Sequence, residues 1–166
     1  MNYNMEQFDV FARRMGINTF HHNCYICFII TWIYYNSYYN EFTHNKNNNN
    51  DKEKATNELN FHFVNNQFLS VILNEFQSIE GPADVMDNGN RVGVIDMRNE
   101  STGVRNVKRV DMAGSDLKKI LLMIYQIRCN LIHGDKMRTP YETDEQLLRW
   151  ASSSLRMLMN NSNLNN

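Results

Sequence analysis

The stretch SDLKKILLMIYQIRCNLIHG, Ser115 to Gly134, decides the fold because it contains the clearest helical pattern in the chain. Its apolar residues recur three and four positions apart, which places them on one face of a helix. They are Leu117, Ile120, Leu121, Ile124 and Ile127. Ser115 is suited to cap the start of this helix, and Gly134 is suited to end it in the left-handed conformation. We therefore expect the helix to finish near Asn130.

Two more helices are predicted upstream of this stretch. In the first, the residues Phe28, Trp32, Tyr35, Tyr39 and Phe42 share one face, and Ile29, Ile30 and Ile33 widen it. We expect that helix to be buried on most sides. The second helix is predicted from about Thr56 to Ile79, where Gly81 and Pro82 end it. Its predicted inward residues are Leu59, Phe61, Val64, Phe68, Val71, Ile72 and Phe76.

A last helix is predicted after the central stretch. Thr143 and Gln146 form a capping-box pair at its start. Its predicted inward residues are Leu147, Leu148, Ala151, Leu155 and Leu158. Residues 160–166 are rich in asparagine and are predicted to fray. Residues 45–54 are Asn-rich with mixed charge, and we expect a flexible surface loop because such a segment buries too little apolar area to offset its ordering entropy.

The helical pattern is absent from residues 82–111, where valines alternate with glycines and asparagines, and a long loop or a short hairpin fits equally well. This insert carries Arg91, Arg98, Arg105, Lys108 and Arg109 against Asp96 and Glu100. One interpretation is a solvated loop, and the other is a surface patch facing RNA. The predicted fold is therefore all-α, a bundle of four to five helices with a loop or short β-hairpin insert.

Bulk properties limit the function. The 166 residues fit a single domain, 1–166, and a formal charge of −1 gives no overall attraction to polyphosphate. The longest apolar stretch, Cys24 to Tyr35, is shorter than the roughly 20 residues of a membrane-spanning helix, so we expect no membrane association. Three cysteines and an N-terminus without a secretory pattern favour the cytoplasm.

The candidate chemistry lies at the end of the central helix. Arg128 follows Ile124 by four residues, so its guanidinium is directed close to the apolar face, where a surface charge is unusual. On an unbroken helix His133 would lie about 140° round from Arg128, but a helix ended by Gly134 could turn the imidazole back. Arginine matches phosphate oxygens, and histidine can act as base or acid at neutral pH. This pair suits RNA transesterification without a metal, and a dimer would supply the second histidine.

The segment YQIRCNLIHGDK, Tyr125 to Lys136, closely resembles the R-x4-6-H signature of the HEPN superfamily, in the form followed by Gly and a nearby Lys. The segment WIYYNSYY, Trp32 to Tyr39, also looks like the aromatic, Asn-containing first helix of such domains. Together the two segments correspond to the helices that usually meet at the family's active site. The insert 82–111 and both termini have no recognisable counterpart, and Cys129 stands where the family often has a polar residue.

The resemblance implies a HEPN-like bundle acting as a metal-independent endoribonuclease that leaves a 2′,3′-cyclic phosphate and a 5′-hydroxyl, commonly as a toxin or antiviral defence effector. Arg128 would bind the scissile phosphate, His133 would be the acid/base group, and Asn130 could orient either one. Lys136, Arg105, Lys108 and Arg109 are the predicted RNA contacts. The implied partners are an RNA substrate, a second copy in a homodimer with a composite site, and an antitoxin or effector-complex protein. No cofactor or metal is expected. The alternative is a non-catalytic module of the same fold that binds a protein or nucleotide.

Other residues admit rival interpretations. His21, His22, Cys24 and Cys27 would suit zinc, but no second ligand pair follows, so buried core thiols are the favoured interpretation. Tyr34, Tyr35, Tyr38 and Tyr39 could stack on bases, yet their helical spacing favours packing in the core or a dimer. Asn36 within this cluster is predicted to have a polar partner, and the Arg128 region is one candidate.

Overall fold

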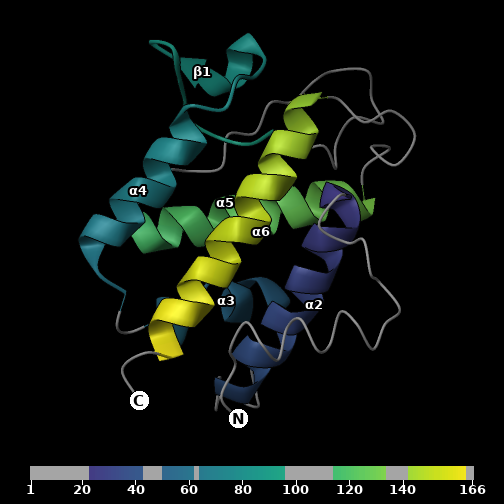
Figure 1. Cartoon of the computed structure of the whole chain (residues 1–166), viewed down its shortest axis with the longest axis vertical. Helices are drawn as coiled ribbons and strands as arrows, with labels where there is room; N and C mark the ends of the chain where they lie inside the picture. The colour runs from purple at the N-terminus through teal and green to yellow at the C-terminus, as the bar shows by residue number, and fades with distance from the viewer. Residues whose placement is uncertain (1–22, 43–49, 62–63, 96–113, 134–141, 164–166) are drawn as a thin grey trace. The chain divides into compact units, whose positions relative to one another are not determined.

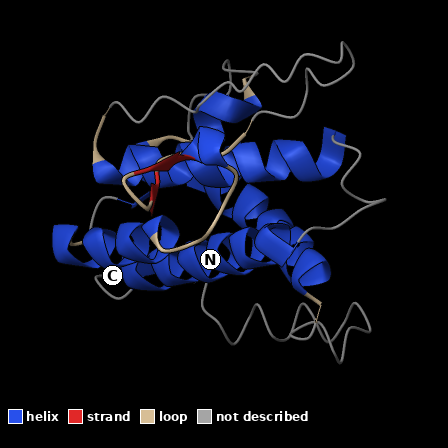
Figure 2. Cartoon of the chain, turned by 90° about the horizontal axis from the view of Figure 1, so that it is seen from above, coloured by secondary structure: helices blue, strands red, loops and turns tan. Residues whose placement is uncertain are grey.

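A computed structural model describes residues 23–42, 50–61, 64–95, 114–133 and 142–163. These residues are mostly helical and include a small two-stranded antiparallel sheet, shown in red in Figure 2 among the blue helices. The all-α class with a short hairpin is thereby confirmed. The described residues fall into two compact units, one drawn from 1–65 and 148–166 and the other from 66–147. No helix in these segments combines the length and apolar character that crossing a bilayer requires.

The first unit is built around α2 (Cys24–Phe42), labelled in Figure 1. Asn23 caps this helix, because its side-chain oxygen accepts hydrogen bonds from the backbone N–H groups of Tyr25 at 3.1 Å and Ile26 at 3.2 Å. The predicted face is buried: Phe28, Trp32, Tyr35 and Tyr39 are each at most 6% exposed. The expectation of burial on most sides is wrong, since Ile29 and Ile33 are exposed while Ile30 is buried. The side chain of Phe42 lies outside the described set.

The short helix α3 (Asp51–Ala55) forms where the sequence predicted the end of a flexible loop. Asn50 caps it by accepting from the N–H groups of Lys52 and Glu53, and the first turn carries the acidic residues that favour a helix N-terminus. Tyr39 on α2 donates a hydrogen bond to Asp51 at 2.6 Å. The loop prediction for 45–54 is therefore wrong from Asp51 on, because capping and this tertiary contact offset the poor composition. Residues 45–49 lie outside the described segments.

The predicted helix from Thr56 to Ile79 is interrupted. The chain forms the 3-10 turn η2 (Glu58–Phe61) and then the helix α4 (Asn66–Gln77). Asn57 accepts from the backbone N–H of Leu59 through its side chain, and Asn60 donates to the carbonyl of Lys54, so local amide bonds compete with a regular helix. As a result Leu59 is 63% exposed instead of inward. Val71 is also exposed, whereas Phe61, Ile72 and Phe76 are buried as predicted.

The helix α6 (Glu142–Asn163) begins one residue before Thr143, which therefore lies in the first turn and not at the predicted cap position. All five predicted inward residues, Leu147, Leu148, Ala151, Leu155 and Leu158, are buried. The helix continues to Asn163, so the frayed tail predicted from Asn160 is wrong for the first four of its residues. Packing explains the extension, because the Ser162 side-chain oxygen lies 2.8 Å from the Tyr38 hydroxyl of α2.

The second unit contains α4, a hairpin and α5 (Asp116–His133), with α4 packed on α5. After the 3-10 turn η3 (Ala83–Val85), strands β1 (Met86–Asp87) and β2 (Asn90–Arg91) pair in the register Met86 with Arg91. Asn88 and Gly89 both have positive φ, 48° and 79°, as a two-residue type I′ turn requires. The 82–111 insert thus begins with a hairpin.

Candidate functional site

The candidate site lies on the C-terminal half of α5. Ser115 caps the start of this helix, since its side-chain oxygen accepts from the backbone N–H of Lys118 at 3.1 Å. The predicted inward residues Leu117, Ile120, Leu121, Ile124 and Ile127 are all buried. Capping and the apolar face therefore fix the position of α5 within its unit. They also position the R-x4-H segment, residues Arg128 to His133, which lies on this helix.

Arg128 lies at the edge of this buried face. Its side chain is half-buried, between the buried residues Ile127 and Cys129. The carbon at the centre of its guanidinium lies 5.8 Å from the centroid of the Tyr125 ring, three residues earlier on the same helix. A contact of this length is a cation–π interaction, which holds the charge along the helix surface without neutralising it.

Asn130 is buried and its amide is engaged with the protein. Its side-chain nitrogen donates to the carbonyl of Ile95 at 2.5 Å, and its side-chain oxygen accepts from the amide nitrogen of Gln126 at 2.9 Å. Asn130 and Gln126 are 4% and 7% exposed. The bond from Asn130 to Ile95 joins α5 to the segment that follows the hairpin, and the bond from Gln126 to Asn130 lies within α5. Orientation of Arg128 or His133 by Asn130 stays a prediction.

The helix α5 is longer than predicted. It runs without a break from Asp116 to His133 and does not finish near Asn130. Ideal helix geometry then places positions 128 and 133 about 140° apart around the axis and about 7.5 Å apart along it. Within one chain the helix backbone therefore holds the two positions on different faces. The helix thus extends three residues beyond Asn130, to the residue before Gly134.

The other predicted site residues are outside the described set. This applies to Lys136, Arg105, Lys108, Arg109, and the side chain of His133. Arg91 is one of the cations of the insert, which the sequence predicted to lie either in a solvated loop or in a patch facing RNA. Both interpretations are wrong for Arg91, since it is 3% exposed. Its guanidinium donates to the carbonyls of Glu80 at 3.1 Å and Gly93 at 3.3 Å, and lies 5.8 Å from the Phe76 ring centroid. It secures the hairpin instead of facing RNA.

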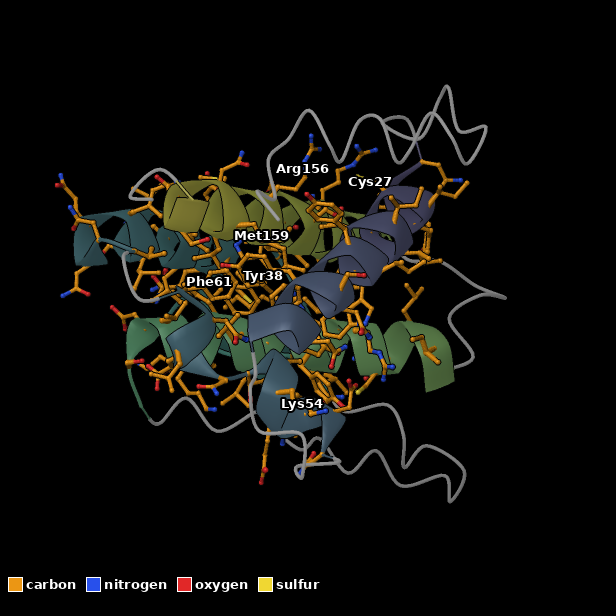
Figure 3. The ribbon with its side chains drawn as sticks, turned by 90° about the horizontal axis from the view of Figure 1, so that it is seen from below. Cys27, Tyr38, Lys54, Phe61, Arg156 and Met159 are labelled. Carbon is orange, nitrogen blue, oxygen red and sulfur yellow. The ribbon has the colours of Figure 1, made fainter. Side chains whose placement is uncertain are left out.

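The tyrosine cluster of α2 forms part of a core. Tyr35, Tyr38 and Tyr39 are at most 2% exposed, and the rings of Tyr35 and Tyr38 stack on Phe61 with centroids 5.8 and 5.6 Å apart. Figure 3 labels Tyr38 and Phe61 within this cluster. Burial raises the pKa of all of Tyr34, Tyr35 and Tyr38, in Tyr34 to about 12. The interpretation as core packing is confirmed for the three buried rings.

Asn36 has a partner on its own helix. Its side-chain oxygen accepts from the amide nitrogen of Asn40 at 2.6 Å, and the same nitrogen also donates to the Asn36 carbonyl at 2.9 Å. The prediction that Asn36 has a polar partner is confirmed. The pairing is local, between residues four apart on α2, as is common for amides on a helix surface.

The cysteines of α2 differ in exposure. Cys24 is 4% exposed, Cys27 is half-buried, and neither is in a disulfide. The core interpretation is confirmed for Cys24. His21 and His22 lie outside the described segments, and among the residues that are described no group of three or more His, Cys, Asp and Glu side chains could hold a metal ion.

Sequence reasoning did not identify the role of the Gln126, Asn130 and Ile95 contact. A signal was present, because two amides four residues apart lie within the mainly apolar stretch from Ile120 to Ile132. Buried amides require partners, so the pair indicated a bond to a neighbouring segment. The partner itself is a backbone carbonyl 35 positions earlier in the chain, which no side-chain pattern reports.

No protein-family model matches the chain, and comparisons with curated proteins and with solved structures found no match.

Proposed function

We propose that the chain is a metal-independent endoribonuclease, and that a second copy completes its active site. The observation that supports this proposal is the position of the R-x4-H segment on α5. Arg128 lies half-buried at the edge of an apolar face, and His133 ends the helix. The resemblance of this segment and of Trp32 to Tyr39 to the HEPN superfamily supplies the reaction class.

The chemistry assigns one role to each group. The ribose 2′-oxygen attacks the adjacent phosphorus while the bond to the leaving 5′-oxygen breaks, which yields a 2′,3′-cyclic phosphate and a 5′-hydroxyl. One histidine accepts the 2′-hydroxyl proton and another donates a proton to the 5′-oxygen. The guanidinium of Arg128 stabilises the charge that develops on the phosphoryl oxygens. Because each chain contains R-x4-H once, at Arg128 and His133, the second histidine would be His133 of another copy.

The geometry of α5 also favours a composite site. Positions 128 and 133 lie about 140° apart on an unbroken helix. The guanidinium of one copy and the imidazole of another can contact the same phosphate more easily when the ends of their two α5 helices face each other. The same geometry supports the alternative function, a non-catalytic module that binds a protein or nucleotide through Arg128, since a binding surface does not require the two groups to converge.

Cleavage assays separate the two functions. The purified chain is incubated with structured and unstructured RNA in EDTA, and the product ends are identified. We expect cyclic-phosphate ends, with activity lowered at least 100-fold by Arg128→Ala or His133→Ala, which is the usual loss on removing an electrostatic or acid/base group. Arg149→Ala, an exposed arginine on α6, is the matched control and should cleave normally. Cleavage that needs magnesium, or that survives both substitutions, would contradict the proposal.

A further inference from the structure

The outward side of α2 carries three isoleucines that remain exposed. Ile26, Ile29 and Ile33 are 38%, 39% and 45% exposed, and they follow one another at steps of three and four residues. Side chains at this spacing are neighbours along a helix, so the three form one continuous apolar strip. Single exposed apolar side chains are normal on a protein surface, whereas a contiguous group of them indicates an interaction surface.

The same spacing continues through two asparagines, Asn36 and Asn40. Positions 26, 29, 33, 36 and 40 alternate steps of three and four, which is the repeat of residues at the contact line of two paired helices. We call these five residues the α2 stripe. The Asn36 side-chain oxygen accepts from the Asn40 amide at 2.6 Å. An asparagine in such a contact line selects the register and the number of chains.

The α2 stripe lies on a helix without charge. Residues 24–40 contain no aspartate, glutamate, lysine or arginine. A helix on a protein surface normally carries charged residues on its outward face, and the centre of a protein interface is depleted of them. The composition of the α2 stripe is therefore that of an interface and not of a solvated helix face.

The absence of charge favours a second copy of the same chain as the partner. In a two-fold symmetric dimer a surface meets its own copy, so a charged residue at its centre is brought close to a like charge. The α2 stripe avoids this repulsion. A lipid surface fits less well, because helices that lie on membranes flank their apolar side with lysine or arginine, and residues 24–40 have neither.

We propose that the α2 stripe is a homodimer interface in which the α2 helices of two copies pack in parallel. Parallel packing places each isoleucine beside its counterpart and brings the amides of Asn36 and Asn40 of the two copies together. An antiparallel pair with the same overlap would bring the isoleucine end of one stripe against the asparagine end of the other. The inference depends on α2 alone, and it holds whether or not the chain cleaves RNA.

The size of the α2 stripe sets the expected affinity. Fourteen steps along the helix from position 26 to position 40 span about 21 Å, and a helix with its side chains is about 10 Å wide. This contact is smaller than the roughly 800 Å² that each partner buries in a standard interface. We therefore expect a weak dimer, with a dissociation constant of about 1–100 µM.

Sedimentation velocity of the full chain, under reducing conditions and over a range of concentrations, tests the interface. Ile33→Asp should weaken dimerisation at least about 30-fold, since each dimer loses two buried isoleucines and gains two opposed carboxylates. Circular dichroism checks that the variant folds. If it does not, Ile33→Gln is measured in its place and should weaken dimerisation at least about five-fold through the lost burial alone.

Val71→Asp is the matched control. Val71 is 47% exposed on α4, and most of its neighbours one turn away are polar, namely Gln67, Asn74 and Glu75. It is outside the α2 stripe, so its substitution introduces the same charge on an exposed helix face without touching the proposed interface. This variant should dimerise like the unchanged protein.

Mixing variants identifies the partner and its orientation. Equimolar Ile33→Asp and Ile33→Lys chains should dimerise at least about ten-fold more tightly than either variant alone, because opposite charges then meet across the interface. Added salt should weaken this mixed dimer. Mixing Ile26→Asp with Ile26→Lys should give the same recovery, because parallel packing places position 26 beside its own copy.

Four results would overturn the inference. They are a chain that stays monomeric well above about 100 µM, a dimer that Ile33→Asp leaves intact, equal weakening by Val71→Asp, and a position-33 mixture that does not recover. Recovery at position 33 without recovery at position 26 would overturn the parallel packing.

The outcomes are separable from those of the proposed function. RNA cleavage that depends on Arg128 and His133, in a protein whose dimer is indifferent to Ile33→Asp, overturns this inference alone. A dimer that Ile33→Asp dissociates, in a protein that does not cleave RNA, supports this inference and contradicts the proposed function.

Discussion

Replacing Tyr35 by phenylalanine removes one buried hydroxyl and keeps the ring packing. Tyr35 is 1% exposed, its hydroxyl donates to the Ala55 carbonyl at 2.5 Å, and its ring stacks on Phe61. The substitution leaves the Ala55 carbonyl, in the core of the first unit, without the hydrogen bond from the Tyr35 hydroxyl. We therefore expect the free energy of unfolding at pH 7 to fall by about 1–3 kcal/mol, the usual cost of an unsatisfied buried group.

The pH dependence of this difference is the sharper test. Burial raises the pKa of Tyr35 above its usual value of 10.0. The native state therefore keeps the phenolic proton to higher pH than the unfolded state does. The stabilisation from Tyr35 is fully present below pH 10 and is lost as the pH rises from there through the folded-state pKa. At one pH unit above the unfolded value the loss is about 1.4 kcal/mol.

Tyr35→Phe lacks this titration, so the stability difference from the unchanged protein should narrow by about 1.4 kcal/mol between pH 9 and pH 11. Urea unfolding followed by circular dichroism measures both quantities. Phe28→Leu is the control, since Phe28 is a buried ring of the same helix that packs on Trp32 and carries no titrating group, and its stability difference should not change with pH. A Tyr35→Phe difference that stays constant up to pH 11, or that is absent at pH 7, would refute the reasoning.

Three substitutions in the second unit test the hairpin by the same urea titrations. Gly81→Ala should lower stability by about 1–3 kcal/mol, because the added Cβ would lie 2.9 Å from both the Arg91 guanidinium and a Val85 methyl. Arg91→Met should cost about 1–3 kcal/mol by leaving the carbonyls of Glu80 and Gly93 without their donor. Gly89→Ala should cost only about 1–2 kcal/mol, the penalty of its φ of 79°, since no atom lies within 4 Å of the added Cβ. A neutral Gly81→Ala, a neutral Arg91→Met, or a Gly89→Ala that costs well over about 2 kcal/mol would contradict these assignments.

Apolar spacing predicted the helices whose inward residues have no competing polar contacts. The faces of α5 and α6 are buried residue by residue as predicted. The prediction of a continuous helix failed between Thr56 and Asn65. There the side-chain amides of Asn57 and Asn60 form hydrogen bonds with nearby backbone groups and interrupt the helix that the apolar spacing predicted. Prediction from apolar spacing failed again at α3, because a helix of five residues depends on its cap and on the Tyr39 contact, and neither appears in a hydrophobic pattern.

The candidate site was predictable in part. The spacing from Ile124 to Arg128 predicted a guanidinium close to the buried face, and Arg128 is half-buried there. The helix α5 was predicted to finish near Asn130, whereas it runs to His133, the residue before Gly134. The burial of Arg91 was not predicted, because its hydrogen-bond acceptors are backbone carbonyls. The charge composition of the insert gives no information about such acceptors.

The three cysteines act as native reporters of local unfolding. Cys24 on α2 and Cys129 on α5 are 4% and 2% exposed, so a thiol reagent reaches either sulfur only after the surrounding helix opens. These two residues belong to different units. Labelling rates read by mass spectrometry therefore measure the opening of each unit in one sample, with the half-buried Cys27 as the faster internal reference.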